Sequence, residues 1–258
     1  MNIICALLSL PVSIILIRWL MRCKKENPFV RGNVRRLVIA GILSGIVGSI
    51  VTGIFLAINA VRLFGLDNLV AVIQNPENTG KIMEIINDIQ KREISFAQTF
   101  VAQLIAVGFA EELSRYFFLR MGTRKQAFAK TWLDYTICGG IVGTGFTIIE
   151  DLFYSSGGVI TTIFRSLMPF HFMYGAIMGY FVGKAIETGQ KKYYVPGIMI
   201  PVLLHTLFDS SLHAVGRNDL YIILAAVMFI VSISVTAFMI VKINRWSKAA
   251  AEKIAAEE

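Results

Sequence analysis

Residues 37–61 read LVIAGILSGIVGSIVTGIFLAINAV, and no charged side chain occurs anywhere in this stretch. A helix needs roughly 20 apolar residues to cross the hydrocarbon core of a bilayer, which is about 30 Å thick. The stretch is long enough, and its only polar side chains are hydroxyls and one amide. It therefore predicts a transmembrane helix.

Six more apolar stretches of similar length occur along the chain, at residues 3–21, 95–118, 134–154, 165–186, 194–214 and 219–241. Of the 258 residues, 55% are hydrophobic and only 16% are charged, and the mean hydropathy is +0.65. Soluble domains have a charged share of about a quarter. We expect an all-α, polytopic membrane bundle of about seven transmembrane helices that forms one domain over residues 1–258.

Basic residues alternate between dense and sparse segments. Segments 22–36, 119–133, 187–193 and the tail after residue 241 together carry 16 lysines and arginines, whereas the segments between them carry six. Because lysine and arginine concentrate on the cytoplasmic side of membrane proteins, this distribution places the N-terminus outside and the C-terminus in the cytoplasm. The sequence thus predicts a multi-pass protein of the cell membrane.

The net charge of +8 could in principle indicate a nucleic-acid partner. However, the basic residues lie at the ends of the apolar stretches, and no segment interleaves them with the aromatic residues that strand-binding surfaces need. We therefore expect membrane lipid, and no nucleic acid, around this protein.

One long external segment, about residues 66–93, separates the second and third stretches. Within it, Ile82, Ile85, Ile86 and Ile89 recur at helical spacing beside charged residues. This pattern predicts an amphipathic helix that lies on the outer surface of the membrane or extends the third apolar stretch. Both interfacial packing and binding of a partner are compatible with it.

Ionisable side chains interrupt four of the apolar stretches. They are Glu111, Glu112 and Arg115 in the third, Glu150 in the fourth, His171 in the fifth, and His205 with Asp209 in the sixth. A charged residue at the bilayer centre costs about 2.5–3.5 kcal/mol on insertion scales, so these side chains should face one another, a metal ion or water. Such a cluster indicates a functional site, in a core of about residues 95–215.

Spacing relates these residues within each helix. Glu111 and Arg115 lie four apart with the acid first, the favourable order for a helical ion pair, so we predict that Arg115 pairs with Glu111. His205 and Asp209 also lie four apart and share a helix face. With the N-terminus outside, the ionisable residues fall in the middle or the outer half of their helices. We expect them to converge at one level that is open to the external side.

The chemistry of this residue set points to amide hydrolysis by one of two schemes. Imidazole and carboxylate groups bind zinc, which can generate hydroxide near neutral pH, and a remaining glutamate can pass the proton of water to a leaving amine. Alternatively, histidine and a carboxylic acid can donate hydrogen bonds to an oxyanion. Taken singly, each residue also has a structural interpretation, such as an ion pair between Glu111 and Arg115.

The order of these residues resembles a known family. Glu111-Glu112-Leu113-Ser114-Arg115, Phe146-x-x-x-Glu150, His171 and His205-x-x-x-Asp209 are similar to the four motifs of PrsW-type intramembrane proteases. These proteases belong to a wider superfamily with the CAAX prenyl proteases and bacteriocin-processing proteins. The resemblance covers roughly residues 100–215, on four successive apolar stretches.

The resemblance implies a glutamate-dependent, metal-assisted peptide-bond hydrolase within the membrane. Glu111 and Glu112 would activate water. Glu150, His171 and His205 would bind a divalent metal, with zinc expected, or polarise the carbonyl group. The implied catalytic residues are Glu111, Glu112, Arg115, Glu150 and Asp209, and Asp209 is also a candidate metal ligand.

The resemblance also implies a location and a partner. PrsW-type enzymes are associated with cutting a membrane-bound anti-sigma factor on its outer side, which implies a single-span substrate in the bacterial inner membrane. The chain departs from the family pattern at three positions: Arg115 stands where lysine is usual, and Asp151 and Asp209 stand where asparagine is common.

Two other functions remain open from the sequence. A catalytically inactive scaffold of the same superfamily would carry similar motifs, and only an activity measurement would separate it from an enzyme. An ion-coupled transporter would use the same acids and histidines as a relay, but it predicts two related halves with interrupted helices in matching positions. We find no such repeat.

Overall fold

The computed structural model describes residues 3–25, 28–67, 70, 74, 95–154, 167–215 and 219–257, and within them the chain is helical and contains no strand. The long helices are α1 (Ile3–Cys23), α2 (Arg31–Phe64), α7 (Trp132–Tyr154), α9 (Phe170–Thr188), α10 (Tyr194–Ala214) and α11 (Asp219–Glu257). A further stretch consists of α5 (Phe96–Gln103), the π-helix η2 (Leu104–Phe109) and α6 (Ala110–Thr123). A short 3₁₀ turn, η4 (Lys191–Tyr193), precedes α10. The predicted all-α class is confirmed.

Four segments of the described chain are long and apolar enough to cross a membrane: Arg31–Ile58, Trp132–Phe153, Lys191–Ala214 and Leu220–Glu257. The protein is therefore a helical membrane protein. Each of the seven apolar stretches predicted from the sequence overlaps a helix in the described part of the chain. The external amphipathic helix predicted around residues 82–89 lies outside the described residues.

Two helix boundaries differ from the sequence prediction. α9 begins at Phe170 rather than near residue 165, with Pro169 at its N-cap, because the residue before a proline disfavours helical backbone. α11 continues to Glu257 instead of ending near residue 241, so that it is 39 residues long. Its last part is rich in alanine, lysine and glutamate, which are strong helix formers.

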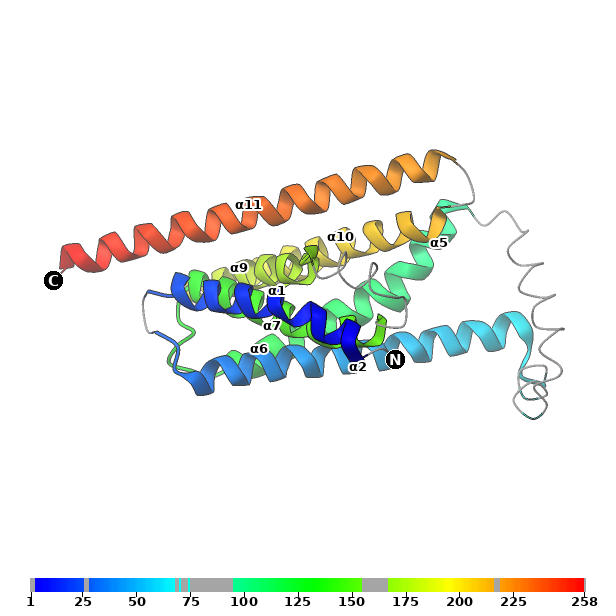
Figure 1. The fold of residues 1–258 in the computed structure, drawn as a ribbon, viewed down its shortest axis with the longest axis horizontal. Helices are drawn as coiled ribbons and strands as arrows, with labels where there is room; N and C mark the ends of the chain where they lie inside the picture. Colours follow the sequence, from blue (N-terminus) through cyan, green and yellow to red (C-terminus); the bar gives the residue numbers. More distant parts are fainter. Residues whose placement is uncertain are drawn as a thin grey trace.

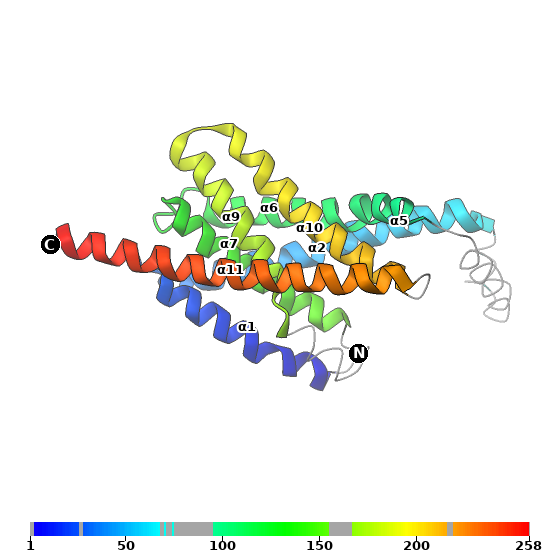
Figure 2. The ribbon, with the colours of Figure 1, turned by 90° about the horizontal axis from the view of Figure 1, so that it is seen from above.

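The helix α7 lies at the centre of the bundle, in contact with α1, α2, α6, α9 and α11 (Figure 1). Its contact with α9 is the most extensive of all helix pairs. The last helix, α11, lies across the outside of the bundle, where it also contacts α1, α9 and α10 (Figure 2). This arrangement surrounds α7 and α9, which carry Glu150 and His171, with other helices.

Glycines allow α7 and α9 to approach closely. A Cβ atom at Gly139 would collide with the carbonyl oxygen of Gly175, and one at Gly143 would collide with the carbonyl oxygen of His171. Small residues four apart permit such backbone contact between membrane helices. The Gly143 contact is important for the site, because it fixes the position of the backbone that carries His171.

We expect Gly139→Val to destabilise the protein, because the added side chain would push α7 away from α9. Overpacking of a close-packed interior costs about 1–3 kcal/mol. Thermal unfolding in detergent should show a lower melting temperature. Gly53→Ala is the matched control, because nothing lies within 4 Å of a Cβ atom there, and it should leave the melting temperature unchanged or raise it. Equal melting temperatures for Gly139→Val and wild type would contradict the close approach.

Candidate active site and metal centre

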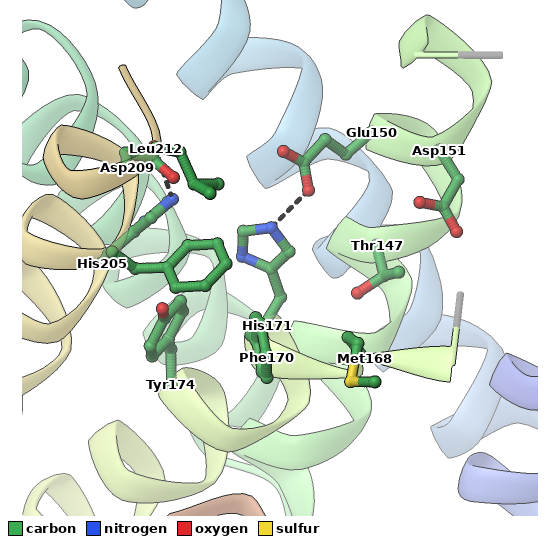
Figure 3. A pocket seen from close by; sticks show the side chains of 11 residues that line it. Thr147, Glu150, Asp151, Met168, Phe170, His171, Tyr174, His205, Asp209 and Leu212 are labelled. Atoms are coloured by element: carbon green, nitrogen blue, oxygen red, sulfur yellow. Dashed lines mark ion pairs between the residues drawn. The ribbon is translucent and has the colours of Figure 1, made fainter. Parts of the chain in front are cut away.

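The ionisable residues predicted from the sequence meet at one buried centre. A cavity of about 250 Å³ lies beside them, and Figure 3 shows Glu150, His171, His205 and Asp209 around it. The cavity is lined by Thr147, Glu150, Asp151, Met168, Phe170, His171, Tyr174, His205, Phe208, Asp209 and Leu212. The wall thus combines acids and imidazoles with apolar side chains from α7, α9 and α10.

Arg115 is the buried cation of this centre and has no exposed surface. It forms an ion pair with Glu112, donates a hydrogen bond to Nδ1 of His171 at 2.9 Å, and its guanidinium lies 4.2 Å from the ring centroid of Phe146. The predicted pairing of Arg115 with Glu111 is wrong. The rings of Phe146 and His171 hold the guanidinium of Arg115 between α7 and α9. Glu112, three residues before Arg115, lies on the same side of the helix.

Glu111 instead lies between α2 and α10. A Cβ atom at Gly48 of α2 would approach the Cα atom of Glu111 to 3.2 Å, and Oε2 of Glu111 lies 3.8 Å from Nε2 of His205. Oε2 is buried and accepts no hydrogen bond from the described residues. Glu111 therefore carries a carboxylate oxygen that is available for chemistry.

Glu112 orients His205. Its Oε1 atom lies 2.9 Å from Nδ1 of His205, while its other oxygen pairs with Arg115. A carboxylate held by an arginine accepts hydrogen bonds, so Nδ1 of His205 carries a proton and donates it to Glu112. A histidine that donates its other ring N–H to a carboxylate is the usual arrangement of a metal-binding imidazole.

His171 is oriented in the opposite sense. A guanidinium group only donates, so Nδ1 of His171 must accept the bond from Arg115. The proton of the neutral ring then lies on Nε2, which faces the carboxylate of Glu150 in an ion-pair contact. Nε2 of His171 could bind a cation in the other tautomer, in which the proton lies on Nδ1 and the contact with Arg115 is released.

Acceptors outnumber donors at the centre. Nε2 of His205 faces Oδ2 of Asp209 at 3.4 Å as well as the carboxylate of Glu111, so two carboxylates approach one ring nitrogen. Arg115, the arginine of this centre among the described residues, pairs with Glu112. A buried excess of negative charge is costly unless a cation or protons neutralise it. The residues therefore fit a metal ion.

The structure also indicates which residues could hold that ion. Glu111, His171 and His205 each offer one ligand atom, and these atoms lie within 4.8 Å of one another. Two histidines and a glutamate are a known ligand set of catalytic zinc sites. From the sequence, Glu150 rather than Glu111 was expected as the third ligand. In the structure Glu150 contacts the imidazole of His171, and its role as a metal ligand stays a prediction.

The π-helix η2 immediately precedes the two glutamates and was not predicted, since residues 95–118 show a uniform apolar pattern. Its altered hydrogen bonding is supported by the hydroxyl of Thr52, which donates to the carbonyl oxygen of Ala106 at 2.7 Å. Gly108 within η2 packs so closely on α10 that a Cβ atom would collide with Thr206. A π-helical turn rotates the following residues around the helix axis, and such turns are frequent at functional sites. Here the turn sets the direction of Glu111 and Glu112.

Two further residues of the cavity could not be singled out from the sequence. Asp151 lies near the end of an apolar stretch, yet it is only 2% exposed and lines the cavity. Tyr174 follows His171 by three residues and therefore shares its helix face. Its ring stacks on His205, with centroids 5.0 Å apart.

Residues 33–236 match the sequence model of the family described as PrsW family intramembrane metalloprotease. The chain belongs to the PrsW family. The match includes every ionisable residue of the candidate site, and it confirms the family resemblance seen in the four motifs. No solved structure matches the chain.

Several bacterial proteins named Protease PrsW are similar to this family member. The protein of Halalkalibacterium halodurans is 34% identical over 132 residues, which is 49% of this chain and 61% of the relative. The protein of Bacillus subtilis is 30% identical over 155 residues, which is 58% of this chain and 70% of the relative. The protein of Shouchella clausii is 30% identical over 119 residues, which is 44% of this chain and 55% of the relative. This PrsW-family chain thus spans between about half and 70% of the length of these relatives.

Proposed function

We propose that this chain is an intramembrane protease that hydrolyses a peptide bond of a membrane-anchored protein near its extracytoplasmic side. The observation that carries the proposal is the meeting of Glu111, His171 and His205, with ligand atoms within 4.8 Å of one another, inside a buried centre. The family description and the names of the bacterial relatives support it.

In the proposed reaction, Glu111 is the general base. The oxygen of a water molecule bonds to the carbonyl carbon of the scissile peptide while Glu111 takes a proton from that water. The carbon–nitrogen bond then breaks, and Glu111 returns the proton to the leaving amine, so that one water yields one new carboxyl group and one new amine. The free carboxylate oxygen of Glu111 supports this role.

The neighbouring residues position this reaction. Arg115 and Glu112 hold His171 and His205 in fixed orientations through Nδ1. The carboxylate of Glu150 faces Nε2 of His171, and Asp209 lies beside Nε2 of His205. These contacts keep the two imidazoles directed at one point without further reorganisation, which is the basis of electrostatic catalysis.

We propose zinc as the metal, held by Glu111, His171 and His205, with Glu150 and Asp209 next to the ligating nitrogens. When bound, the ion would polarise the scissile carbonyl as a Lewis acid. Because a carboxylate has two oxygens, Glu111 can hold the cation with one and accept the proton of water with the other.

For the membrane arrangement, we propose seven crossings with the N-terminus outside and the C-terminus in the cytoplasm, in a bacterial inner membrane. The proposed cytoplasmic segments carry 16 basic residues and the proposed external segments carry six, which supports this orientation. It would put the cavity in the outer half of the bilayer. A single-span protein, such as an anti-sigma factor, is the substrate we propose, and the wider CAAX protease superfamily is the proposed ancestry.

Cleavage in proteoliposomes tests this function. Purified wild-type protein should cut a single-span peptide once, near the end that faces outside. A wild-type protein that binds such peptides without cutting any of them would instead indicate an inactive scaffold and would contradict the proposal.

Metal binding gives a prediction that does not depend on activity. We expect wild-type protein to bind one divalent ion per chain and His205→Ala to bind none, because the substitution removes a ligand and leaves Glu112 without its imidazole partner. Metal content measured on purified protein by mass spectrometry checks this. His213→Ala is the control, because His213 is exposed at the end of the same helix. Equal metal content in the two variants would overturn the assignment of His205.

A further inference from the structure

The hydroxyl of Tyr174 is an unused polar group in the wall of the cavity. The side chain is 1% exposed, and its oxygen has no hydrogen-bond partner among the described residues. A buried hydroxyl without a partner costs about 1–3 kcal/mol. A cost of that size indicates that a group other than the described residues completes the hydrogen bond.

The two site histidines fix the direction of this hydroxyl. The ring of Tyr174 stacks on His205, with 5.0 Å between centroids and an angle of 23° between the planes. It meets His171 edge-on at 5.7 Å. Figure 3 shows the hydroxyl on the side of the ring near His205. Since both imidazoles are themselves held by Arg115 and Glu112, the hydroxyl keeps a constant position relative to Glu111.

We propose that the Tyr174 hydroxyl is a further catalytic group, which donates a hydrogen bond to the scissile carbonyl oxygen of the substrate. This inference rests on the proposed protease function. The neighbouring wall of the cavity offers carboxylates, which only accept when ionised, so a tyrosine is the neutral donor on that side.

The donor would act mainly in the transition state. As water adds to the peptide, the peptide's carbonyl oxygen becomes negatively charged, and a donor already fixed beside that oxygen stabilises the charge more strongly than it stabilises the ground-state carbonyl. The tyrosine keeps its proton throughout. It therefore adds to the role of Glu111 without replacing it.

Tyr174→Phe tests the inference, because it removes the hydroxyl and keeps the ring that packs on both histidines. We expect kcat to fall on the order of 100-fold, as for the loss of one oxyanion donor, with KM and metal content unchanged. The melting temperature should stay constant or rise, since the lost hydroxyl has no partner among the residues that the structure describes. Tyr194→Phe is the matched control, because Tyr194 packs edge-on against Tyr116 outside the cavity.

The outcomes separate this inference from the protease function. If wild-type protein cleaves the peptide and Tyr174→Phe cleaves it with the same kcat, the role of Tyr174 is overturned while the protease stands. A lower melting temperature for Tyr174→Phe would also overturn it, because the hydroxyl would then be a structural bond. If wild-type protein cleaves nothing, the protease function itself fails.

Discussion

Glu111→Gln is expected to abolish peptide cleavage and to leave the protein folded. The amide has nearly the same shape as the carboxylate, but it cannot take a proton from water. Loss of a general base lowers the rate by about 100- to 10,000-fold. The rate should be measured with a single-span peptide in proteoliposomes, beside the melting temperature of each variant.

The control for this prediction is Glu252→Gln, the same chemical change at an exposed position on α11. It should cleave at the wild-type rate. Glu112→Gln provides a second comparison, because Glu112 is bonded to Arg115 and His205 rather than free. It should disturb stability as well as rate. Undiminished cleavage by Glu111→Gln would remove Glu111 from the proposed mechanism.

Arg115→Met is expected to give the largest loss of stability. The substitution leaves Glu112 as a buried charge without its cation and removes the donor to His171. Breaking one partner of a buried ion pair costs about 3–5 kcal/mol. Thermal or denaturant unfolding in detergent should therefore show a strongly lowered midpoint.

A double variant separates the charge effect from packing. In Arg115→Met with Glu112→Gln, the charge that the single substitution leaves unpaired at Glu112 is removed, so much of the lost stability should return. Activity should stay low, because His171 and His205 have both lost the contacts that orient them. If the double variant is no more stable than Arg115→Met alone, the ion pair does not explain the effect.

The helices could be predicted from the sequence because membrane helices consist of long apolar stretches. The stretch 194–214 coincides with α10 at both ends. The start of α9 and the end of α11 were predicted less accurately. Pro169 sets the start of α9, and the high helix propensity of the polar tail extends α11. The π-helix η2 could not be predicted, since it depends on support from Thr52 of another helix.

The members of the site were visible as charges in apolar stretches, but their pairing was not. The four-residue spacing favoured Glu111 as the ion-pair partner of Arg115, whereas Arg115 pairs with Glu112 in the structure. Spacing along one helix cannot tell which side chain a second helix selects. Here Phe146 and His171 decide the direction of the guanidinium. The role of Tyr174 could not be predicted for a related reason. A tyrosine in an apolar stretch indicates packing, and only the structure shows that its hydroxyl is buried without a partner among the described residues.

The central claim is that acids and imidazoles from four helical stretches form one centre that uses water to cut a peptide bond. Cleavage of the single-span peptide in water enriched in the heavy oxygen isotope tests it most directly, with mass spectrometry of the N-terminal fragment. We expect one heavy oxygen in the new carboxyl group of the fragment made by wild-type protein, and no fragment with Glu111→Gln. A fragment without the heavy isotope, or the same yield from both proteins, would contradict hydrolysis at this centre.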